Sequence, residues 1–522
     1  MKTFFFLLLA FSVFFLSCDD GSDDDNDDND DNNDDSQSGD DDSLPGDDDD
    51  DSGDDDSGDD DNDDSGDDDD DNDDNDDETP PDNAVYVDGA SGDDANPGTA
   101  DLPKQTFNAA LTLANAEVRP IVIAEGVYEE ESFSQVISTS VYGGYRASDW
   151  QRNITVHETI LRPLWPLGWT MTNPHESEIR LDGLTIIGPT AEESGQAESI
   201  GISIQDGKIR LTRCRISGGD VVAEYDAQSI GIMVYRSANV VFENNEIDTG
   251  EVSAQSGKAY TCGILFGSEG NAGEGVVRGN RINAGPATNE TSTAWSAGVA
   301  YSVWDFPLLM VNNDIVGGEA DGGFASLSHG VEVYYGDGMT LVNNRLAPGN
   351  CVGGSANAIR TFDQVSTVTL IGNLLTTAAS DLGGGAYLQG NAILINNIIY
   401  AAEDDFTYAL RTLYGTHTLV ANDLKCGTTP CFLLWANAGP VLSIDGVNAC
   451  GWEGCDLSTG NFAAEPEFDS AAYPHLLAGS PCIDAGVDPG TWYDGADAYL
   501  DMDGDARPQG AAFDVGPDEW HD

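Results

Sequence analysis

The sequence predicts an all-β fold, a right-handed parallel β-helix in which short strands stack coil upon coil. Three observations indicate this fold. One short phrase recurs along the chain, a second phrase of alternating residues lies between its copies, and the composition favours turns, with 60 Gly beside only 20 Lys and Arg. A repeat of this kind cannot bury its apolar face alone, so it obtains a core by stacking on its neighbours.

The first phrase is an apolar residue, any residue, two asparagines, any residue and a second apolar residue. Clear copies lie at 242–247, 310–315, 341–346 and 394–399, and weaker copies lie at 181–186, 211–216, 277–282, 370–375 and 419–424. Successive copies end 24 to 35 residues apart. This interval accommodates several short strands and turns but no long helix between the phrases, so it favours a solenoid over a βαβ fold.

The second asparagine of the phrase recurs in almost every copy. Asparagine tolerates the left-handed conformation that a tight corner needs. Its amide can also hydrogen-bond to the copy one coil away. We therefore expect a structural asparagine ladder rather than a ligand site, formed by Asn245, Asn280, Asn313, Asn344, Asn373, Asn397 and Asn422.

The second phrase starts with Gly or Ala and continues with alternating residues, which is typical of a strand. Alternate side chains of a strand point to opposite faces. If Ile232 and Val234 point inward, stacking the copies gives two outward files. The first file is Met233, Leu265, Ala300, Glu332, Arg360, Tyr387 and Arg411, and the second is Tyr235, Gly267, Ser302, Tyr334, Phe362, Gln389 and Leu413.

The second half of these files combines aromatic rings with charged groups. Ring faces and forked guanidinium donors suit sugar binding, and coils about 4.8 Å apart match the length of one sugar residue. We expect a glycan-binding groove whose ligand-binding residues are Tyr235, Tyr334, Phe362 and Tyr387. If the groove is catalytic, Arg360 or Arg411 is the candidate base, and Glu332 or Asp363 is the candidate acid or metal ligand. A solvated strand face with ordinary surface pairs is the alternative.

The N-terminus predicts export. Residues 1–17 form a signal peptide with Lys2 before an apolar run too short to span a bilayer. The small Ser17 before Cys18 resembles a bacterial lipoprotein signal, and that resemblance implies lipidation of Cys18 and a membrane anchor at the bacterial cell envelope or cell surface. Ordinary secretion with an incidental cysteine is the alternative.

Residues 18–82 follow as an acidic linker. The stretch 19–82 holds 38 of the 95 acidic residues and no Lys or Arg. It lacks the apolar residues that a core requires, so we expect a disordered tether. A calcium sponge is the alternative, because carboxylates are ligands for calcium.

The net charge of −75 argues against two classes of partner. Nucleic-acid binding needs a basic footprint, and docking on anionic lipid needs a polybasic patch. Residues 83–522 alone carry 57 acidic and 19 basic side chains, a balance that repels a polyuronate. We expect a monomer that contacts the membrane through its lipid and a polysaccharide through its groove.

Eight cysteines remain besides Cys18, and they predict disulfides in an oxidising compartment without fixing their pairing. The closely spaced pairs are Cys426/Cys431 and Cys450/Cys455. A zinc site is the alternative, but no histidine lies near these pairs.

The regions on either side of the repeat resemble bacterial pectin-lyase-like β-helix proteins. The motifs that carry the resemblance are Val85-Tyr-Val-Asp-Gly, Tyr142-Gly-Gly-Tyr145, Gly479-Ser-Pro-Cys-Ile-Asp-Ala-Gly486, Asp501-Met-Asp-Gly-Asp-Ala-Arg-Pro508 and Phe513-Asp-Val-Gly-Pro-Asp-Glu519. The resemblance implies an N-terminal cap with first coils over 83–177, in which a helix at 106–116 is capped by Thr106. It further implies regular coils over 178–427 and C-terminal coils with a cap over 428–522.

The resemblance does not specify an activity, because this fold carries lyases, hydrolases and adhesins. Ser328-His329-Gly330 matches the Gly-His-Gly motif of polygalacturonases only in part, and we interpret His329 as a turn residue. Asp501, Asp503 and Asp505 alternate around Gly504, a spacing that can converge on calcium, although turn carboxylates have the same pattern. No cofactor is required, and calcium is the candidate ion.

The expected function is therefore that of an exported, lipid-anchored surface protein that binds glycan or another surface ligand without catalysis. A polysaccharide lyase or glycoside hydrolase is one alternative. A purely structural surface protein is the other.

Overall fold

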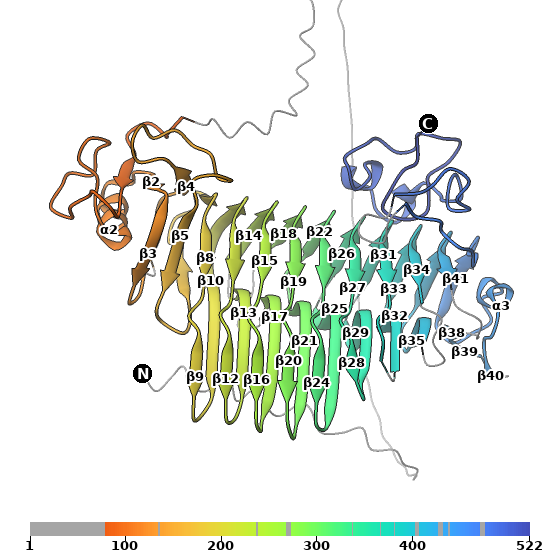
Figure 1. Cartoon of the computed structure of the whole chain (residues 1–522). Coiled ribbons are helices and arrows are strands. Elements are labelled where there is room, and N and C mark those ends of the chain that lie inside the picture. Colours follow the sequence, from red (N-terminus) through yellow and green to blue (C-terminus); the bar gives the residue numbers. More distant parts are fainter. Residues whose placement is uncertain are drawn as a thin grey trace, which may run out of the picture. The chain divides into compact units, whose positions relative to one another are not determined.

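The computed structural model describes residues 79–521 except 134–135, 236–237, 268–272, 337, 366, 381, 402–406, 426–431, 437–438 and 470–474. The predicted signal peptide, Cys18, nearly all of the acidic linker, Cys426 and Cys431 lie outside the described residues. The described part is an all-β right-handed parallel β-helix, as predicted (Figure 1). No helix in it is long and apolar enough to cross a bilayer.

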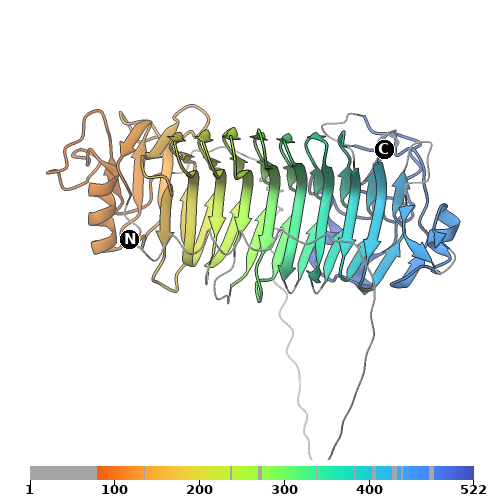
Figure 2. The ribbon, with the colours of Figure 1, turned by 90° about the horizontal axis from the view of Figure 1, so that it is seen from below.

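Each regular coil passes through four strands that belong to four sheets. The coil that starts at β14 (Ala238–Glu243) continues through β15 (Glu246–Asp248), β16 (Val252–Ala254) and β17 (Lys258–Phe266) before β18 (Gly275–Arg278) starts the next coil. We call the sheets that contain β14, β15, β16 and β17 sheets 1, 2, 3 and 4. Each strand pairs in parallel with the equivalent strand of the next coil. Figure 2 shows the coils stacked in sequence order.

Sheets 1 and 2 contain most of the short strands. Sheet 1 also contains β1 (Val85–Val87), β2 (Ile121–Ala124), β4 (Val141–Tyr145), β7 (Ile179–Asp182), the end of β10 (Ala197–Thr212), β22 (Leu308–Val311), β26 (Met339–Val342), β30 (Val368–Ile371), β33 (Ala392–Ile395), β36 (His417–Val420) and β41 (Cys455–Thr459). Sheet 2 also contains β3 (Gly126–Glu130), β5 (Thr159–Pro163), β8 (Thr185–Ile187), β11 (Arg215–Ser217), β19 (Arg281–Asn283), β23 (Asp314–Val316), β27 (Arg345–Ala347), β31 (Leu374–Thr376), β34 (Ile398–Tyr400) and β37 (Asp423–Lys425).

Sheets 3 and 4 complete the coils. Sheet 3 also contains β9 (Ala191–Glu193), β12 (Val221–Ala223), β20 (Ala287–Asn289), β24 (Ala320–Gly322) and β28 (Cys351–Val352). Sheet 4 also contains β6 (Trp169–Thr172), the start of β10, β13 (Ala227–Val234), β21 (Thr293–Ser302), β25 (Ala325–Gly336), β29 (Ser355–Val365), β32 (Leu382–Gln389), β35 (Thr407–Leu413) and β38 (Phe432–Leu433). A small antiparallel pair, β39 (Trp435–Ala436) and β40 (Gly439–Pro440), follows.

Two cores hold the coils together. The main core lies inside sheets 1, 2 and 4 and contains residues such as Phe242, Ile247 and Ile264, all fully buried. A second, alanine-rich core lies between sheet 3 and the first half of the sheet 4 strands, with Ala223, Ala254 and Ala259 among its members. Because alanine is small, the two facing sheets can approach closely, and they form a thin fin along one side of the helix (Figure 1).

The ladder asparagines are hydrogen-bonded to one another through the corner between sheets 1 and 2. For example, Asn344 Oδ1 accepts from Asn313 N at 2.9 Å and from Asn313 Nδ2 at 2.8 Å. Equivalent bonds connect the series from Asn245 to Asn422 and continue to Asn461. Each of the seven predicted ladder residues is at most 2% exposed, and Asn461 is 5% exposed.

The left-handed conformation falls on a different residue from the one expected. The residue before each ladder asparagine adopts it, with φ of 55° at Asn244, 54° at Asn312, 55° at Asn343 and 57° at Asn396. Gly279 takes the same role at 64°. The two asparagines of the phrase therefore have different roles. The first adopts the left-handed conformation at the corner with its side chain outward, and the second forms the ladder inside.

A row of hydroxyl groups, which the sequence analysis did not find, holds the bend between sheets 2 and 3. Ser229 Oγ accepts from Gly250 N at 3.0 Å, and Ser296 Oγ accepts from Gly318 N at 2.7 Å. Ser199 and Ser328 repeat the contact with Gly219 and Gly349. These serines occupy sheet 4 positions that face the fin, where the buried hydroxyl satisfies a backbone N–H that would otherwise lack a partner.

Both ends of the helix are capped. The predicted N-terminal helix is confirmed as α2 (Phe107–Glu117), with Thr106 as its N-cap and Phe107, Leu111 and Ala114 buried. At the other end lie α3 (Ile444–Asn448) and a disulfide between Cys450 and Cys455, one of the closely spaced pairs. Among the described cysteines, Cys214, Cys262, Cys351 and Cys482 are free and buried.

The C-terminal tail, which includes the short 3-10 helices η2 (Pro489–Thr491) and η3 (Ala496–Tyr499), folds back over sheet 1. The outward asparagines of the phrase bind it. Asn343 Nδ2 donates to Leu500 O at 2.6 Å, and Asn396 Nδ2 donates to Val487 O at 2.7 Å. The repeated phrase therefore fixes both the coil and the tail that covers it.

Candidate functional site

The candidate site lies on the outer face of sheet 4. The predicted first file is confirmed there, because strand pairing places Ala300 beside Glu332, Glu332 beside Arg360, Arg360 beside Tyr387 and Tyr387 beside Arg411. We call Glu332, Tyr334, Arg360, Phe362, Tyr387 and Arg411 the strip. Its residues come from β25, β29, β32 and β35 of four successive coils.

Rings and guanidinium groups alternate along the strip. The Tyr334 and Phe362 rings stack with centroids 4.8 Å apart and planes 13° from parallel. The Arg360 guanidinium lies 4.6 Å from the Phe362 ring centroid and 5.6 Å from the Tyr387 ring centroid. The guanidinium of Arg411, one coil further along, lies 4.3 Å from the Tyr387 ring centroid. Such contacts hold both arginines by cation–π attraction.

Glu332 lies beneath these side chains and is only 1% exposed. Burial raises the pKa of its carboxyl to about 7, although the Arg360 charge and hydrogen bonds from Tyr334 and Trp295 lower it. The carboxyl group therefore titrates near neutral pH. This is the behaviour of a group that can take up or release a proton during binding or catalysis.

A polar chain leads away from Glu332 across the same face. His329 Nε2 lies 3.7 Å from Glu332 Oε1, and Asn357 Nδ2 lies 3.4 Å from His329 Nδ1. The Tyr408 hydroxyl donates to Asn357 Oδ1 at 2.8 Å. Burial lowers the pKa of His329 well below its usual value, so the imidazole is neutral. Our interpretation of His329 as a turn residue is wrong, because it lies within β25 and is fully buried.

The prediction that Tyr334 follows Ser302 in the second outward file is wrong. A β-bulge shifts the register, so that Ser302 pairs with Tyr335 rather than with Tyr334. The same bulge continues into the next pair, where Tyr335 lies beside Gln364. Such an extra residue cannot be read from the alternation of the phrase. The Tyr334 ring nevertheless stacks against the ring of Phe362.

Two of the predicted residues do not join this group. Tyr235 lies on an earlier coil, where its hydroxyl accepts from Gln205 Nε2 at 2.6 Å, and the strands β17 and β21 separate it from β25. The side chain of Asp363 lies outside the described part of the structure.

Sequence reasoning missed other aromatic residues on this face. Trp295 stands edge-on to Tyr334 at 5.6 Å and packs against Tyr260 at 4.3 Å. Trp304 and Tyr335 stack at 5.3 Å, and Trp304 is 45% exposed. Trp295 lies three residues before Gly298, the Gly of its phrase, so a window extended toward the N-terminus would have included it.

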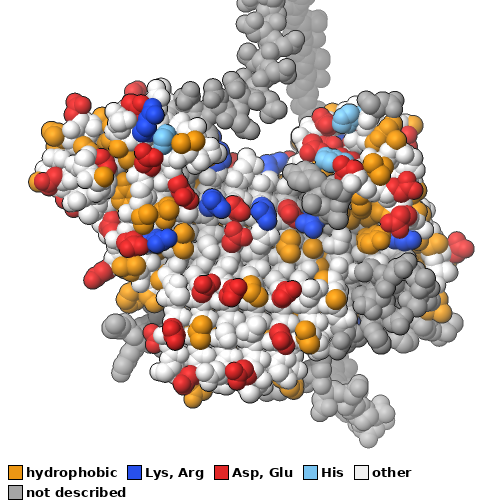
Figure 3. Space-filling model, in the orientation of Figure 1, with side chains coloured by type: hydrophobic (Ala, Val, Ile, Leu, Met, Phe, Trp, Pro, Cys, Tyr) orange, Lys and Arg blue, Asp and Glu red, His pale blue; other side chains and the backbone are white. Residues whose placement is uncertain are grey.

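The opposite side of the helix has a different character. Figure 3 shows a row of basic side chains across its upper part and mainly acidic ones below, over sheets 2 and 3. On sheet 2 the row alternates in sign through paired positions of successive coils. Its members are Arg215, Glu246, Arg281, Asp314 and Arg345, and we call them the charge file. The two acidic side chains of the file neutralise two of its three arginines.

The predicted calcium aspartates have separate partners. Asp501 Oδ1 accepts from the backbone N–H groups of Asp503 and Asp505, and its Oδ2 accepts from Glu519 N. Asp501 thus organises the loop through its carboxylate. Asp503 instead faces His475.

Comparisons with known proteins concern the fold. A family model described as a right-handed beta helix region matches residues 185–346. The chain is similar to the solved structure of pectate lyase Pel9A, with 12% identity, a TM-score of 0.45 and coverage of 84% of this chain and 97% of that one. It is also similar to a rhamnogalacturonan lyase, with 13% identity, a TM-score of 0.34 and coverage of 65% and 87%. The comparison with curated proteins gives no match.

Proposed function

We propose that this protein binds polysaccharide along the strip on sheet 4, and that it does so without catalysis. The observation that carries the proposal is the alternation of ring and guanidinium on successive coils, from Phe362 and Arg360 to Tyr387 and Arg411. Neighbouring coils lie about 4.8 Å apart, so each coil offers one contact per sugar residue.

The strip has the chemistry that sugar recognition requires. Ring faces take the apolar C–H faces of a sugar, and guanidinium forks donate to its hydroxyl and ring oxygens. Tyr334, Phe362, Arg360, Tyr387 and Arg411 are each half-buried, so they are held in place but keep an accessible surface. Stacking fixes these side chains before a ligand arrives, which reduces the entropy lost on binding.

The N-terminal sequence supports a role at the cell surface. In the proposal, Cys18 carries the lipid and the acidic segment 19–82 is a tether between membrane and β-helix. Self-repulsion of its 38 carboxylates extends such a tether. Labelling of cells with radioactive palmitate, with Cys18→Ala as the control, tests the anchor. Retention of label by the variant would contradict it.

A glycan array with the purified mature chain tests the binding function. We expect binding to a defined set of neutral polysaccharides, lost in Tyr387→Ala, because the acidic balance of residues 83–522 repels a polyuronate. Tyr225→Ala is the matched control, because Tyr225 is 57% exposed and lies between β12 and β13 at the end of the fin. Absence of binding to any glycan would leave the structural surface protein as the function.

A polysaccharide lyase or hydrolase is the second candidate function, and the Glu332 pKa of about 7 favours it. A hydrolase needs two carboxylates across the bond, and among the described side chains of the strip Glu332 is the sole carboxylate. A lyase is therefore the more specific alternative, with Arg360 or Arg411 as base and Glu332 as acid. Unsaturated sugars or new reducing ends that disappear in Glu332→Gln would replace the binding proposal with this one.

A further inference from the structure

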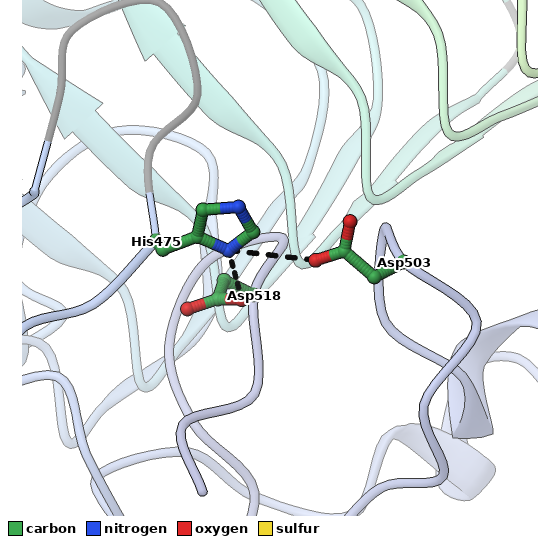
Figure 4. A group of neighbouring side chains, drawn as sticks. All are labelled: His475, Asp503 and Asp518. Carbon is green, nitrogen blue, oxygen red and sulfur yellow. Dashed lines mark hydrogen bonds and ion pairs between the residues drawn. The ribbon is translucent and has the colours of Figure 1, made fainter.

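Three metal-ligating side chains converge on the C-terminal tail, far along the chain from the strip. His475 Nδ1 lies 3.1 Å from Asp518 Oδ1 and 3.4 Å from Asp503 Oδ2. One ligand atom from each of the three residues lies within 4.8 Å of the other two. Figure 4 shows the imidazole and the Asp503 carboxylate pointing toward each other across the space beside Asp518.

Independent contacts hold each of the two carboxylates in place. Asp518 Oδ2 accepts from Leu476 N at 2.7 Å, which leaves Oδ1 directed at His475. The Asp503 loop is fixed by Asp501, whose Oδ1 accepts from Asp503 N at 2.9 Å and from Asp505 N at 2.8 Å. The cluster is therefore preorganised by backbone hydrogen bonds that do not depend on the histidine.

Two of the three distances between the ligand atoms fit a transition-metal site. A tetrahedron with metal–ligand bonds of about 2.0–2.1 Å has edges of roughly 3.3 Å, and the two contacts of His475 Nδ1 measure 3.1 and 3.4 Å. One imidazole nitrogen with two carboxylates suits zinc or manganese better than calcium, which prefers six to eight oxygen ligands. His475 and Asp503 each leave 38% of their side chain exposed, so water can complete the coordination.

The charge balance of the tail favours a dication over a lone imidazolium. Residues 475–521 contain ten acidic side chains and a single arginine, Arg507. Arg507 is already paired with Glu519 at 2.9 Å and is 7% exposed. A protonated His475 would neutralise one of the two facing carboxylates, whereas a divalent cation neutralises both.

We propose that His475, Asp503 and Asp518 form a binding site for a divalent transition metal, with zinc as the probe, and that the metal fastens the C-terminal tail. The site uses one of the three aspartates of the calcium prediction, Asp503, together with two residues that the motif does not contain. The bound metal would connect the segment that begins at His475 to the loop of Asp503 and to the end of the chain at Asp518.

Zinc titration of the mature protein by calorimetry tests the proposal. A large excess of calcium is present to occupy the carboxylates of the acidic segment. We expect one zinc site that weakens by roughly tenfold or more in His475→Gln and in Asp503→Asn. The matched control is His157→Gln, because His157 Nδ1 contacts a single carboxylate, Glu125, at 2.8 Å. Circular dichroism of each variant verifies the fold.

A second readout is the absorption spectrum with cobalt in place of zinc, since tetrahedral coordination by nitrogen and oxygen gives visible bands. Bands that are present in the wild type and absent in His475→Gln support the site. Equal zinc affinity in the wild type and in both cluster variants would overturn the proposal and leave an ordinary His–Asp ion pair. Binding of calcium alone, unchanged in His475→Gln, would overturn it as well.

Discussion

The two halves of the outward file on sheet 4 share one backbone and differ in chemistry. In the first half, Met233, Leu265 and Ala300 pack in a small apolar cluster that includes Leu167 from the loop before β6. In the second half, the same file continues with Glu332, Arg360, Tyr387 and Arg411. The switch takes place between β21 and β25, within a single coil step.

The difference shows that the scaffold and the site depend on different residues. The inward neighbours in these strands, such as Ile232, Ile264 and Val331, are fully buried in both halves. Together with the asparagine ladder they fix the register, so the outward residues are free to vary. A site can therefore occupy a few coils of a solenoid without any change in the coils beside it.

The largest expected effect is the loss of the ladder, which both halves share. Asn344→Ala removes donors to Met310 O and Asn373 Oδ1 and leaves two donors of Asn313 without their acceptor. We expect the free energy of unfolding to fall by about 3–5 kcal/mol, because these groups are buried. Denaturant unfolding of the full chain measures it.

The control for the ladder is Asn239→Ala. Asn239 Oδ1 is an exposed acceptor for a single backbone N–H, that of Glu274 at 3.0 Å. We expect a loss below about 1 kcal/mol. Equal losses in the two variants would show that the ladder contributes no more than a surface amide.

The next largest effect is a pH dependence of stability that comes from Glu332, in the second half of the file. The raised Glu332 pKa of about 7, against 4.5 for the unfolded chain, means that the folded state binds the proton more tightly. Stability therefore falls as pH rises from about 4.5 to 7. Glu332→Gln removes this titration, so at pH 8 the free energy of unfolding of the variant should exceed that of the wild type by on the order of 3 kcal/mol, and at pH 4 the two should be similar.

Unfolding curves of both proteins across this pH range provide the measurement. Asp423 and Asp514 also have pKa values raised by burial, to about 7 and about 6, but they titrate alike in wild type and variant. The difference between the two curves thus reports Glu332 alone. A difference that is constant with pH would mean that folding does not raise the pKa of the Glu332 carboxyl.

The smallest effect is expected on the charge file. Arg281 is 63% exposed and lies 3.4 Å from Glu246. Arg281→Ala should change the free energy of unfolding by less than about 0.5 kcal/mol, and salt should remove even that change. The same variant should leave glycan binding intact. A larger loss, seen in thermal unfolding at low and high salt, would assign the file a structural role.

Much of this architecture was predictable because it repeats. The spacing of the Asn-Asn phrase gave the coil length, and the alternation after each Gly gave the outward file that includes Glu332 and Arg360. Thr106 and the apolar spacing after it located the capping helix. These signals are local and periodic, because every coil must place apolar residues in the same core.

The parts that could not be predicted are those where a single coil departs from the repeat. The bulge at Tyr334 displaces one file by a residue, and the burial of His329 depends on the neighbouring strands β21 and β29 rather than on its own phrase. The contact of His475 with Asp518 joins residues 43 positions apart in the non-repetitive tail. Strands of sheets 2 and 3 with only two or three residues gave too little alternation to recognise.

The most direct test compares glycan affinity when each half of the outward file is truncated. With a polysaccharide identified on the array, calorimetry is carried out on Arg360→Ala/Tyr387→Ala/Arg411→Ala and on Met233→Ala/Leu265→Ala. We predict a loss of roughly 100-fold or more for the first variant and an unchanged affinity for the second. Equal affinities, or a loss confined to the second variant, would contradict the assignment of polysaccharide binding to the strip.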